Sequence, residues 1–406
     1  MKNSKLRALA LVWGALMIAV ISSTVTLLVS GRMGGGAGES RRWVTQAEYD
    51  TIARYSRLDE VRQTLLKDYY REVDDDALVL GAIRGMTGSL EDPYTFYYTP
   101  DELRRENEDT AGVYFGIGTL LQNTAEGEIE IVRVFPDSPA EAAGLHIGDV
   151  ILAVDGVAVT GVDGRSYLEA VRRMRGGEGT RVTLTVRRNG ERMAIPVTRG
   201  DVKVSYASYQ VLPGNIGYIS ITQFTGDASQ VFSEAIEAFR AQGVAGLVID
   251  VRNNPGGLLD QVVSMADAIL PDGLIVCTKQ RDGSRQDYYS DAKYFDVPLA
   301  VLVNGMSASA SEILAGSVQA LGRGTVVGLT TYGKGVVQSL QTFQSDKAGM
   351  QLTTASYFDA LDRCPQGVGV RPDVEVALEG TSLPLEPDPV SDNQLAEAIR
   401  VVSGGL

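Results

Sequence analysis

The sequence predicts an α/β protein of several domains. Its 406 residues are too many for one ordinary core. After residue 200, apolar runs of strand length at 216–221, 246–251 and 299–303 alternate with stretches of helical length, the pattern of a sheet covered by helices. Upstream, short alternating strands such as 129–134 and 181–186 are separated by glycine turns. We therefore expect a small β-module followed by an α/β domain.

The amino terminus has the features of a membrane segment. Lys2, Lys5 and Arg7 precede an uncharged run at residues 8–30, and about 20 apolar residues suffice to cross a bilayer. The basic flank favours a cytoplasmic amino terminus, which places the rest of the chain outside the cytoplasm. A cleaved signal peptide is the alternative, but its apolar region is normally about 7–15 residues long, and no convincing small-x-small cleavage site follows the run.

These patterns divide the chain into consecutive regions. Residues 46–107 are expected to be helical, because apolar side chains recur three or four positions apart, as on one helix face. The side chains of that face are Leu58, Val61, Leu65, Leu66 and Tyr69. The predicted regions are a cytoplasmic tail at 1–7, a transmembrane anchor at 8–30, a linker at 31–45, the helical segment at 46–107, the β-module at 108–198, the α/β domain at 200–380 and a tail with a short helix at 381–406.

Composition excludes several classes of function. The formal net charge of -14 argues against nucleic acid as a partner. The one histidine, His146, is far along the chain from every nucleophile candidate, so a Ser-His-Asp or Cys-His site is not expected. The two cysteines, Cys277 and Cys364, lie in no redox or metal motif, and the sequence leaves their pairing open. No metal site and no cofactor are predicted.

The β-module carries an ordered series of glycine turns and strands. Residues 114–118 (Tyr-Phe-Gly-Ile-Gly) are followed by 136–145 (Pro-Asp-Ser-Pro-Ala-Glu-Ala-Ala-Gly-Leu) and by Gly-Asp-Val-Ile at 148–151. The series resembles a PDZ domain, in which a glycine-rich turn before a strand exposes N–H groups that capture a peptide's terminal carboxylate. The resemblance implies that Phe115, Gly116, Ile117 and Gly118 form this loop. Arg175 is a candidate regulatory residue, and a β-module that binds nothing is the alternative.

The candidate chemistry lies between residues 300 and 338. A buried strand ends at Asn304, and small residues lead from it into a helix carrying Ser307, Ser309 and Ser311. Such a strand-to-helix turn can expose a nucleophile next to backbone N–H groups. Further on, Lys334 stands between two glycines. Since no histidine is at hand, a buried lysine is the remaining strong base for a serine hydroxyl, because burial disfavours its charged form and lowers its pKa.

Three segments together resemble the C-terminal processing peptidases, also called tail-specific proteases. They are residues 246–258, 307–312 and 333–338, and the likeness extends over roughly residues 75–375. The resemblance implies a crotonase-like β/β/α protease core with the PDZ-like module inserted before it. It implies Ser309 as the nucleophile, Lys334 as the base and Gln338 as the assisting residue. The oxyanion hole maps onto the backbone N–H groups of Gly256, Gly257 and Ala310. Tyr332 stands where the family usually has phenylalanine.

Each assignment has a structural alternative. Ser309 and Glu312 match a capping box, in which the serine satisfies a helix N–H. Ser307 and Ser311 offer the same hydroxyl chemistry. Lys334 by itself reads as a solvated turn residue. Residues 334–338 of a regular strand span roughly 13 Å, so Lys334 and Gln338 come into contact only if the chain bends.

We therefore expect a membrane-anchored serine endopeptidase that cleaves proteins near their carboxyl terminus. The PDZ-like module would bind the substrate's terminal carboxylate or a regulator and gate the site. Single-pass anchoring in the cell membrane would place both modules on the extracytoplasmic side. A homodimer is suggested only by analogy, from the helical segment and residues 394–402. The alternatives are an inactive membrane-tethered PDZ scaffold and a Ser/Lys amidase acting on small amides.

Overall fold

The computed structural model describes residues 45–111, 113–124, 127–159, 165–380, 383–384 and 386–404. The predicted tail at 1–7, the anchor at 8–30 and all but the last residue of the linker at 31–45 lie outside these residues. Among the residues that are described, no helix has the length and apolar character needed to span a membrane. The chain separates into two compact units, Met1–Gly81 and Ala82–Leu406.

The first unit contains helix α2 (Gln46–Asp68) and the start of α3 (Asp75–Gly88). Thr45 and Glu48 form a capping box that begins α2. The periodicity predicted this helix, but none of its residues is buried, and its apolar side chains stay about half exposed. An ion pair between Arg62 and Asp75 joins α2 to the start of α3. The first unit therefore carries an apolar face that its own described residues do not cover.

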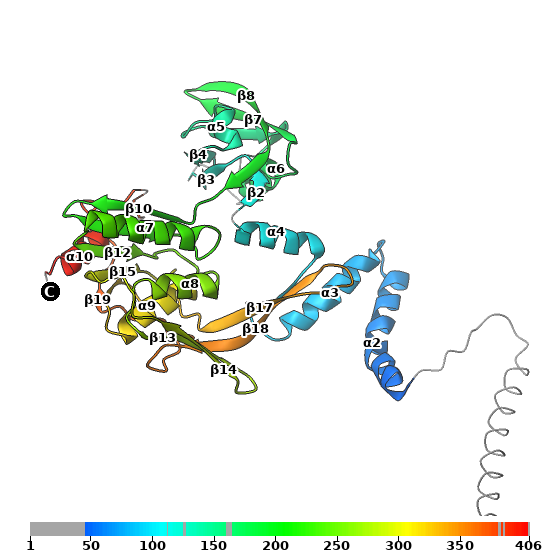
Figure 1. Ribbon diagram of the computed structural model, residues 1–406. Coiled ribbons are helices and arrows are strands. Elements are labelled where there is room, and N and C mark those ends of the chain that lie inside the picture. Colours follow the sequence, from blue (N-terminus) through cyan, green and yellow to red (C-terminus); the bar gives the residue numbers. More distant parts are fainter. Residues whose placement is uncertain are drawn as a thin grey trace, which may run out of the picture. The chain divides into compact units, whose positions relative to one another are not determined.

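The middle module is a twisted antiparallel sheet closed by two helices (Figure 1). The strands are β2 (Val113–Gly116), β3 (Thr119–Asn123), β4 (Ile129–Val134), β5 (Val150–Val154), β6 (Val157–Ala158), β7 (Arg181–Arg188), β8 (Glu191–Thr198) and β9 (Gly200–Lys203), and the helices are α5 (Pro139–Ala142) and α6 (Arg165–Met174). The main sheet runs β3-β4-β5-β7-β8, and β2 pairs with β9. The strands predicted at 129–134 and 181–186 are confirmed. Alternate residues of β7 (Val182, Leu184 and Val186) are buried, as the period of two requires.

The α/β domain is built on a sheet that runs β10-β11-β12-β15-β16-β19. Its strands are β10 (Ala207–Leu212), β11 (Ile216–Ile221), β12 (Gly246–Asp250), β15 (Leu299–Val303), β16 (Thr325–Gly328) and β19 (Val374–Glu375), and its helices are α7 (Ala228–Gln242), α8 (Leu259–Asp267), α9 (Ala310–Ala320) and α10 (Asn393–Val402). The strands predicted near 216, 246 and 299 are confirmed, and β11, β12 and β15 lie parallel to one another.

Helices cover both faces of this sheet (Figure 1). Leu247 and Ile249 of β12 belong to the core that also contains residues of α7, α8 and α9. Val248, between them, belongs to the separate core that contains α10. The central strands read as continuous apolar runs because each of their faces is buried against helices.

A second, antiparallel sheet lies beside the first. Its order is β1-β18-β13-β14, and β17 also pairs with β18. The strands are β1 (Phe96–Tyr98), β13 (Gly273–Gln280), β14 (Arg285–Ser290), β17 (Val336–Thr342) and β18 (Gly349–Phe358). Helix α4 (Pro100–Ala111) follows β1. The second sheet thus joins a strand from the region predicted to be helical, β1, to the strand that follows Lys334.

Candidate active site

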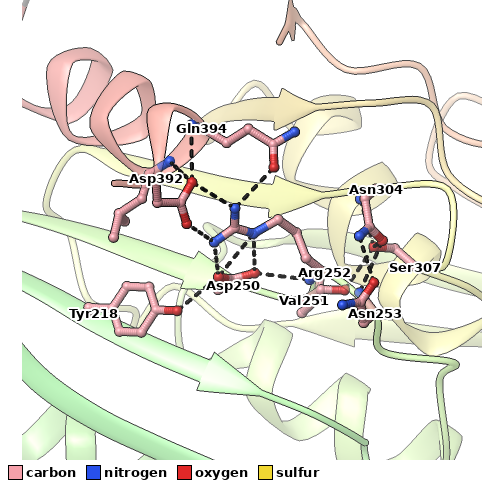
Figure 2. Close-up of polar contacts among 10 residues, drawn as sticks. Tyr218, Asp250, Val251, Arg252, Asn253, Asn304, Ser307, Asp392 and Gln394 are labelled. Atoms are coloured by element: carbon pink, nitrogen blue, oxygen red, sulfur yellow. Dashed lines mark hydrogen bonds and ion pairs between the residues drawn. The ribbon is translucent and has the colours of Figure 1, made fainter. Parts of the chain in front are cut away.

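The turn after β12 is held by a buried charge network (Figure 2). The Arg252 guanidinium donates to Asp250 at 2.6 Å and to Asp392 at 2.7 Å, and its side chain is only 3% exposed. Gln394 accepts a further bond at 3.0 Å, and the Tyr218 hydroxyl donates to Asp250 at 2.8 Å. Buried charges are tolerated when they are paired in this way. Since Asp392 is the N-cap of α10, the network joins the carboxyl-terminal helix to the start of the Asn-Asn-Pro-Gly-Gly turn.

The turns after β12 and β15 are bonded to each other as well. The Asn253 N–H donates to Asn304 Oδ1 at 3.0 Å, and the Asn304 amide donates back to Asn253 Oδ1 at 2.8 Å. The Ser307 hydroxyl donates to the Val251 carbonyl at 2.7 Å. Figure 2 shows these contacts at the carboxyl ends of the two neighbouring strands. The two turns therefore form one unit.

Ser309 lies in a strained backbone conformation at the start of α9. Its φ of 54° and ψ of -111° are unusual for a residue other than glycine. The turn after β12 approaches Ser309 closely. This explains the glycine at position 256, because a Cβ on residue 256 would lie 2.8 Å from Ser309 Cβ. One half of the predicted capping box is formed, because the Ser309 N–H donates to the Glu312 carboxylate at 2.8 Å. The Glu312 N–H donates to the Ser309 carbonyl, also at 2.8 Å, and not to the Ser309 hydroxyl. The Ser309 hydroxyl is therefore not used to cap α9, and Ser309 is half-buried in this strained turn.

The two neighbouring serines are engaged in structural hydrogen bonds. Ser307 and Ser311 are both buried. Ser311 donates to the Asn254 carbonyl at 2.9 Å, as Ser307 does to Val251. Ser309, in contrast, lines a cavity of about 420 Å³. Of the three candidate hydroxyls, that of Ser309 is the one placed to meet a ligand in this cavity.

Glu312 connects the serine turn to the lysine loop. Its buried carboxylate accepts hydrogen bonds from the Ser309 N–H at 2.8 Å, the Gly333 N–H at 2.7 Å and the Lys334 N–H at 2.8 Å. The Thr331 hydroxyl donates a fourth bond at 2.6 Å. Sequence analysis assigned Glu312 only a capping role. The donors near Lys334 reach the Glu312 carboxylate only in the folded chain, so no local sequence pattern predicts these hydrogen bonds.

Lys334 is half-buried, and its backbone is fixed. The Tyr357 hydroxyl is 2.7 Å from the Lys334 carbonyl and 3.1 Å from the Ser309 carbonyl, so this side chain spans both segments. Burial lowers the pKa of the Lys334 amine below its ordinary value, while the carboxylates of Asp92 and Glu312 oppose that effect. The direction is the one that a general base requires near neutral pH.

The Lys334 amine is not bonded to Ser309 in this structure. Among the described residues, none accepts a hydrogen bond from it, and the ammonium nitrogen lies 4.4 Å from the centroid of the Tyr94 ring. Ser309 and Lys334 nevertheless line the same cavity. A proton transfer between the two side chains would require the Lys334 amine to leave the Tyr94 ring.

Gln338 lines the same cavity from β17. The register between β17 and β18 shifts between Val337 and Gln338. The regular strand assumed in the 13 Å estimate is therefore interrupted, and contact between Lys334 and Gln338 would require such an interruption. The Gln338 amide donates to the Thr353 hydroxyl at 3.2 Å. Gln338 is therefore bonded to β18, and a direct bond between the side chains of Gln338 and Lys334 is absent from the described residues.

Two of the three predicted oxyanion donors remain available. No described residue accepts a hydrogen bond from the N–H groups of Gly257 or Ala310, and both residues line the cavity. The prediction that Gly256 supplies an oxyanion donor is corrected, because the Gly256 N–H already donates to Asn254 Oδ1 at 2.8 Å. At Gly257, φ is 146° and a Cβ would lie 2.2 Å from the Phe224 carbonyl oxygen, so only glycine fits.

The middle module has a groove of about 130 Å³ between β3 and α6. Its lining includes Gly116, Ile117, Gly118 and Arg175. No described residue accepts a hydrogen bond from the N–H groups of Ile117 or Gly118. Phe115 does not line this groove, and its carbonyl accepts a bond from Gly176 at 3.3 Å. The glycine turn therefore offers free donors, as a carboxylate-binding loop requires.

The remaining special residues lie away from the reacting groups. His146 is exposed in a turn of the middle module, where its N–H donates to Asp149. Cys277 and Cys364 are both free thiols, so the pairing left open by the sequence is not formed in this structure.

Comparison with known families gives the class of protein. Residues 215–376 match the model of peptidase family S41, residues 130–188 match the PDZ domain, and residues 36–101 match the activating protease CtpB N-terminal domain. Together with the fold, these matches define a serine-type peptidase with a mixed α/β, multi-domain architecture and a PDZ domain.

Individual relatives agree with that class. The chain is 36% identical over 342 residues to the carboxy-terminal-processing protease of Bartonella bacilliformis, covering 82% of this chain and 77% of that protein. It is 32% identical over 375 residues to the carboxy-terminal processing protease CtpA of Bacillus subtilis, covering 92% and 78%. The chain therefore belongs to the carboxy-terminal processing proteases of peptidase family S41, and the family resemblance predicted from the sequence is confirmed.

A solved structure supports the fold. A putative S41 protease from Bacteroides fragilis aligns with a TM-score of 0.54, covering 91% of this chain and 99% of that chain. The sequence identity is 16%, so this likeness concerns the fold alone.

Proposed function

We propose that the protein is a membrane-anchored endopeptidase that cleaves proteins near their carboxyl terminus through a Ser309/Lys334 acyl-enzyme mechanism. One observation carries the proposal: the nucleophile, the base and the two unbonded N–H groups of Gly257 and Ala310 line a single cavity. A crotonase-like β/β/α description of the core belongs to the same proposal.

The chemistry proceeds in two stages. Neutral Lys334 takes the proton of the Ser309 hydroxyl, whose oxygen attacks the scissile carbonyl carbon while the N–H groups of Gly257 and Ala310 stabilise the oxyanion. The lysine then gives that proton to the leaving amine as the peptide bond breaks. In the second stage the neutral lysine takes a proton from water, whose oxygen attacks the acyl carbon. The bond from that carbon to the Ser309 oxygen then breaks, and the lysine returns the proton to this oxygen, which restores the serine hydroxyl and the neutral amine. Gln338 orients the lysine through β18.

The PDZ domain is proposed to bind the free carboxyl terminus of the substrate. The support is the pair of N–H groups at Ile117 and Gly118, from which no described residue accepts a hydrogen bond, beside a groove of about 130 Å³. Arg175 lines the same groove and is the proposed link between occupancy and activity. Substituting Arg175 by methionine should weaken the activation that a carboxyl-terminal peptide produces, without removing the chemistry.

Membrane anchoring and self-association complete the proposal. The apolar run at 8–30 with its basic flank supports a single-pass anchor that leaves both modules on the extracytoplasmic side. The uncovered apolar face of α2, with Leu58 and Val61 about half exposed, supports a homodimer. Membrane fractionation of the chain with and without residues 1–30, and sedimentation of the soluble form, test these two points.

Cleavage of a reporter protein with an apolar carboxyl-terminal tail tests the activity itself. Ser309→Ala and Lys334→Ala should each lower the rate by roughly a thousandfold or more, as expected for members of one catalytic unit. His146→Ala is the matched control, because it removes the one histidine in the chain and should leave cleavage unchanged. Undiminished cleavage by either of the first two variants would reject the mechanism.

A further inference from the structure

The Lys334 amine rests against a segment some 240 residues away in the sequence, in the loop before β1. Its nitrogen lies 4.4 Å from the centre of the Tyr94 ring, and no described residue receives a hydrogen bond from it. A ring face attracts an ammonium group more strongly than a neutral amine. The contact therefore favours the protonated lysine, which is the form that cannot act as a base.

Asp92 adds a negative charge to the same position. Burial raises the pKa of this carboxyl, but hydrogen bonds from Thr95, from Thr353 and from the Tyr94 N–H outweigh it, so the net pKa is below the ordinary value. The bond from the Thr95 hydroxyl is 2.7 Å long and that from the Tyr94 N–H is 3.0 Å. Asp92 is therefore ionised at neutral pH and stabilises a cation beside it.

The second sheet fixes the segment that carries Asp92 and Tyr94. The Gln351 amide donates to the Tyr94 carbonyl at 3.2 Å, and the Thr353 N–H donates to the Thr95 hydroxyl at 3.0 Å. Both partners belong to β18, which also pairs with β1. Thr353 is the residue to which Gln338 donates. The ring and the carboxylate are thus held in place, and the lysine stem is the part that moves.

Other titratable groups face Lys334 from the elements packed around it. The Glu312 carboxylate of α9 accepts hydrogen bonds from backbone N–H groups and from the Thr331 hydroxyl. The Tyr357 hydroxyl of β18 donates to main-chain carbonyls. Burial raises the pKa of Tyr94, and a hydrogen bond with Tyr332 of the lysine's own loop, which favours the neutral phenol, raises it further. Tyr94 therefore stays a neutral phenol, with an electron-rich face available to the ammonium group.

We propose that Tyr94, supported by Asp92, is a positioning residue that docks the protonated Lys334 side chain and holds it away from Ser309. The inference rests on the proposed role of Lys334 as the base. Activation then consists of the amine releasing its proton to solvent and turning from the ring to the serine.

The pH dependence of kcat/KM with a tailed reporter tests this docking, because that quantity titrates groups of the free enzyme. Removing the Tyr94 ring, which favours the protonated Lys334, lowers the pKa of the Lys334 amine. The acidic limb of the profile of kcat/KM against pH therefore moves to lower pH. Tyr94→Leu should move it by about half to one pH unit, the size expected for one cation–π contact. On that limb the variant should be about three- to tenfold faster than the parent relative to its own plateau. Asp92→Asn should move the limb in the same direction, and the conservative variant Tyr94→Phe should restore the parental position.

Competitive acetylation by acetic anhydride gives a readout without catalysis. In a Ser309→Ala background, the reactivity of the Lys334 amine against pH, followed by mass spectrometry of its peptide, should show the same shifts. An acidic limb and an acetylation curve that both stay in place in Tyr94→Leu would overturn the docking. If that variant does not fold, an unmoved titration in Asp92→Asn overturns it instead. Lys334→Ala distinguishes a failure of the proposed function from a failure of the docking. Cleavage that is retained in this variant rejects the proposed function. Cleavage that is lost, together with an unmoved titration curve in Tyr94→Leu, rejects only the docking.

Discussion

The serine turn and the lysine loop form two walls of the same cavity, and they are held in different ways. On the serine wall, backbone strain, a helix start and the hydroxyls of Ser307 and Ser311 fix both the main chain and the position of Ser309. On the lysine wall, Glu312 and Tyr357 fix the main chain, but no described residue accepts a hydrogen bond from the Lys334 amine, which lies against the Tyr94 ring. The difference teaches that the proposed nucleophile is fixed in advance, while the side chain of the proposed base is held less tightly.

The largest expected effect comes from breaking the support of the serine wall. Arg252→Met would leave the carboxylates of Asp250 and Asp392 buried without their partner, and removing one member of a buried ion pair costs about 3–5 kcal/mol. Urea denaturation should show this loss as a lower midpoint. Arg240→Met is the matched control, because its pair with Glu237 is exposed and 3.9 Å long, and it should barely move the midpoint. Equal midpoints for the two variants would mean that the network of Figure 2 is not what holds the turn.

A smaller effect should follow from disconnecting the two walls. Glu312→Gln replaces one acceptor oxygen by an NH₂ group, so two of the four donors lose their acceptor at about 1–3 kcal/mol each. The free energy of unfolding should fall by about 2 kcal/mol or more, and labelling of Ser309 by a serine-directed probe should slow, because both turns lose their common anchor. Parental stability together with a parental labelling rate would show that Glu312 does not join the walls.

The smallest effect is expected at the neighbouring serines. Ser311→Ala removes one hydroxyl-to-carbonyl bond, worth about 1 kcal/mol, and the probe should still label the protein at Ser309. Mass spectrometry of the labelled peptide checks this. If the label moves away from Ser309, or if Ser311→Ala alone abolishes labelling, the assignment of Ser309 as the nucleophile is wrong.

The parts of the site that the sequence predicted are those with a local signature. A glycine turn, small residues after a buried strand and a lysine between glycines are short patterns, and they led to Ser309, Lys334 and Gly257. The 13 Å estimate for Gln338 assumed a regular strand, whereas the β17–β18 register shifts at that residue, and no hydrogen bond joins Gln338 to Lys334 among the described residues.

The parts that escaped prediction depend on contacts between distant segments. Tyr94 and Asp92 lie in a loop with no motif of its own, and only the pairing of β1 with β18 brings them to the lysine. The assignment of Gly256 failed because a side chain two residues earlier, Asn254, takes its N–H. Residue type and spacing cannot reveal such competition, since it is decided by the direction in which a side chain points after folding.

The central claim is that the Lys334 amine activates Ser309. The most direct measurement is the rate at which a serine-directed probe acylates Ser309 as a function of pH, in the parent and in Lys334→Ala. Because burial lowers the pKa of the amine, the parental rate should rise through an apparent pKa below the ordinary lysine value. The variant should be slower by about a hundredfold or more and lack that titration. A variant that keeps both the parental rate and its pH dependence would contradict the account.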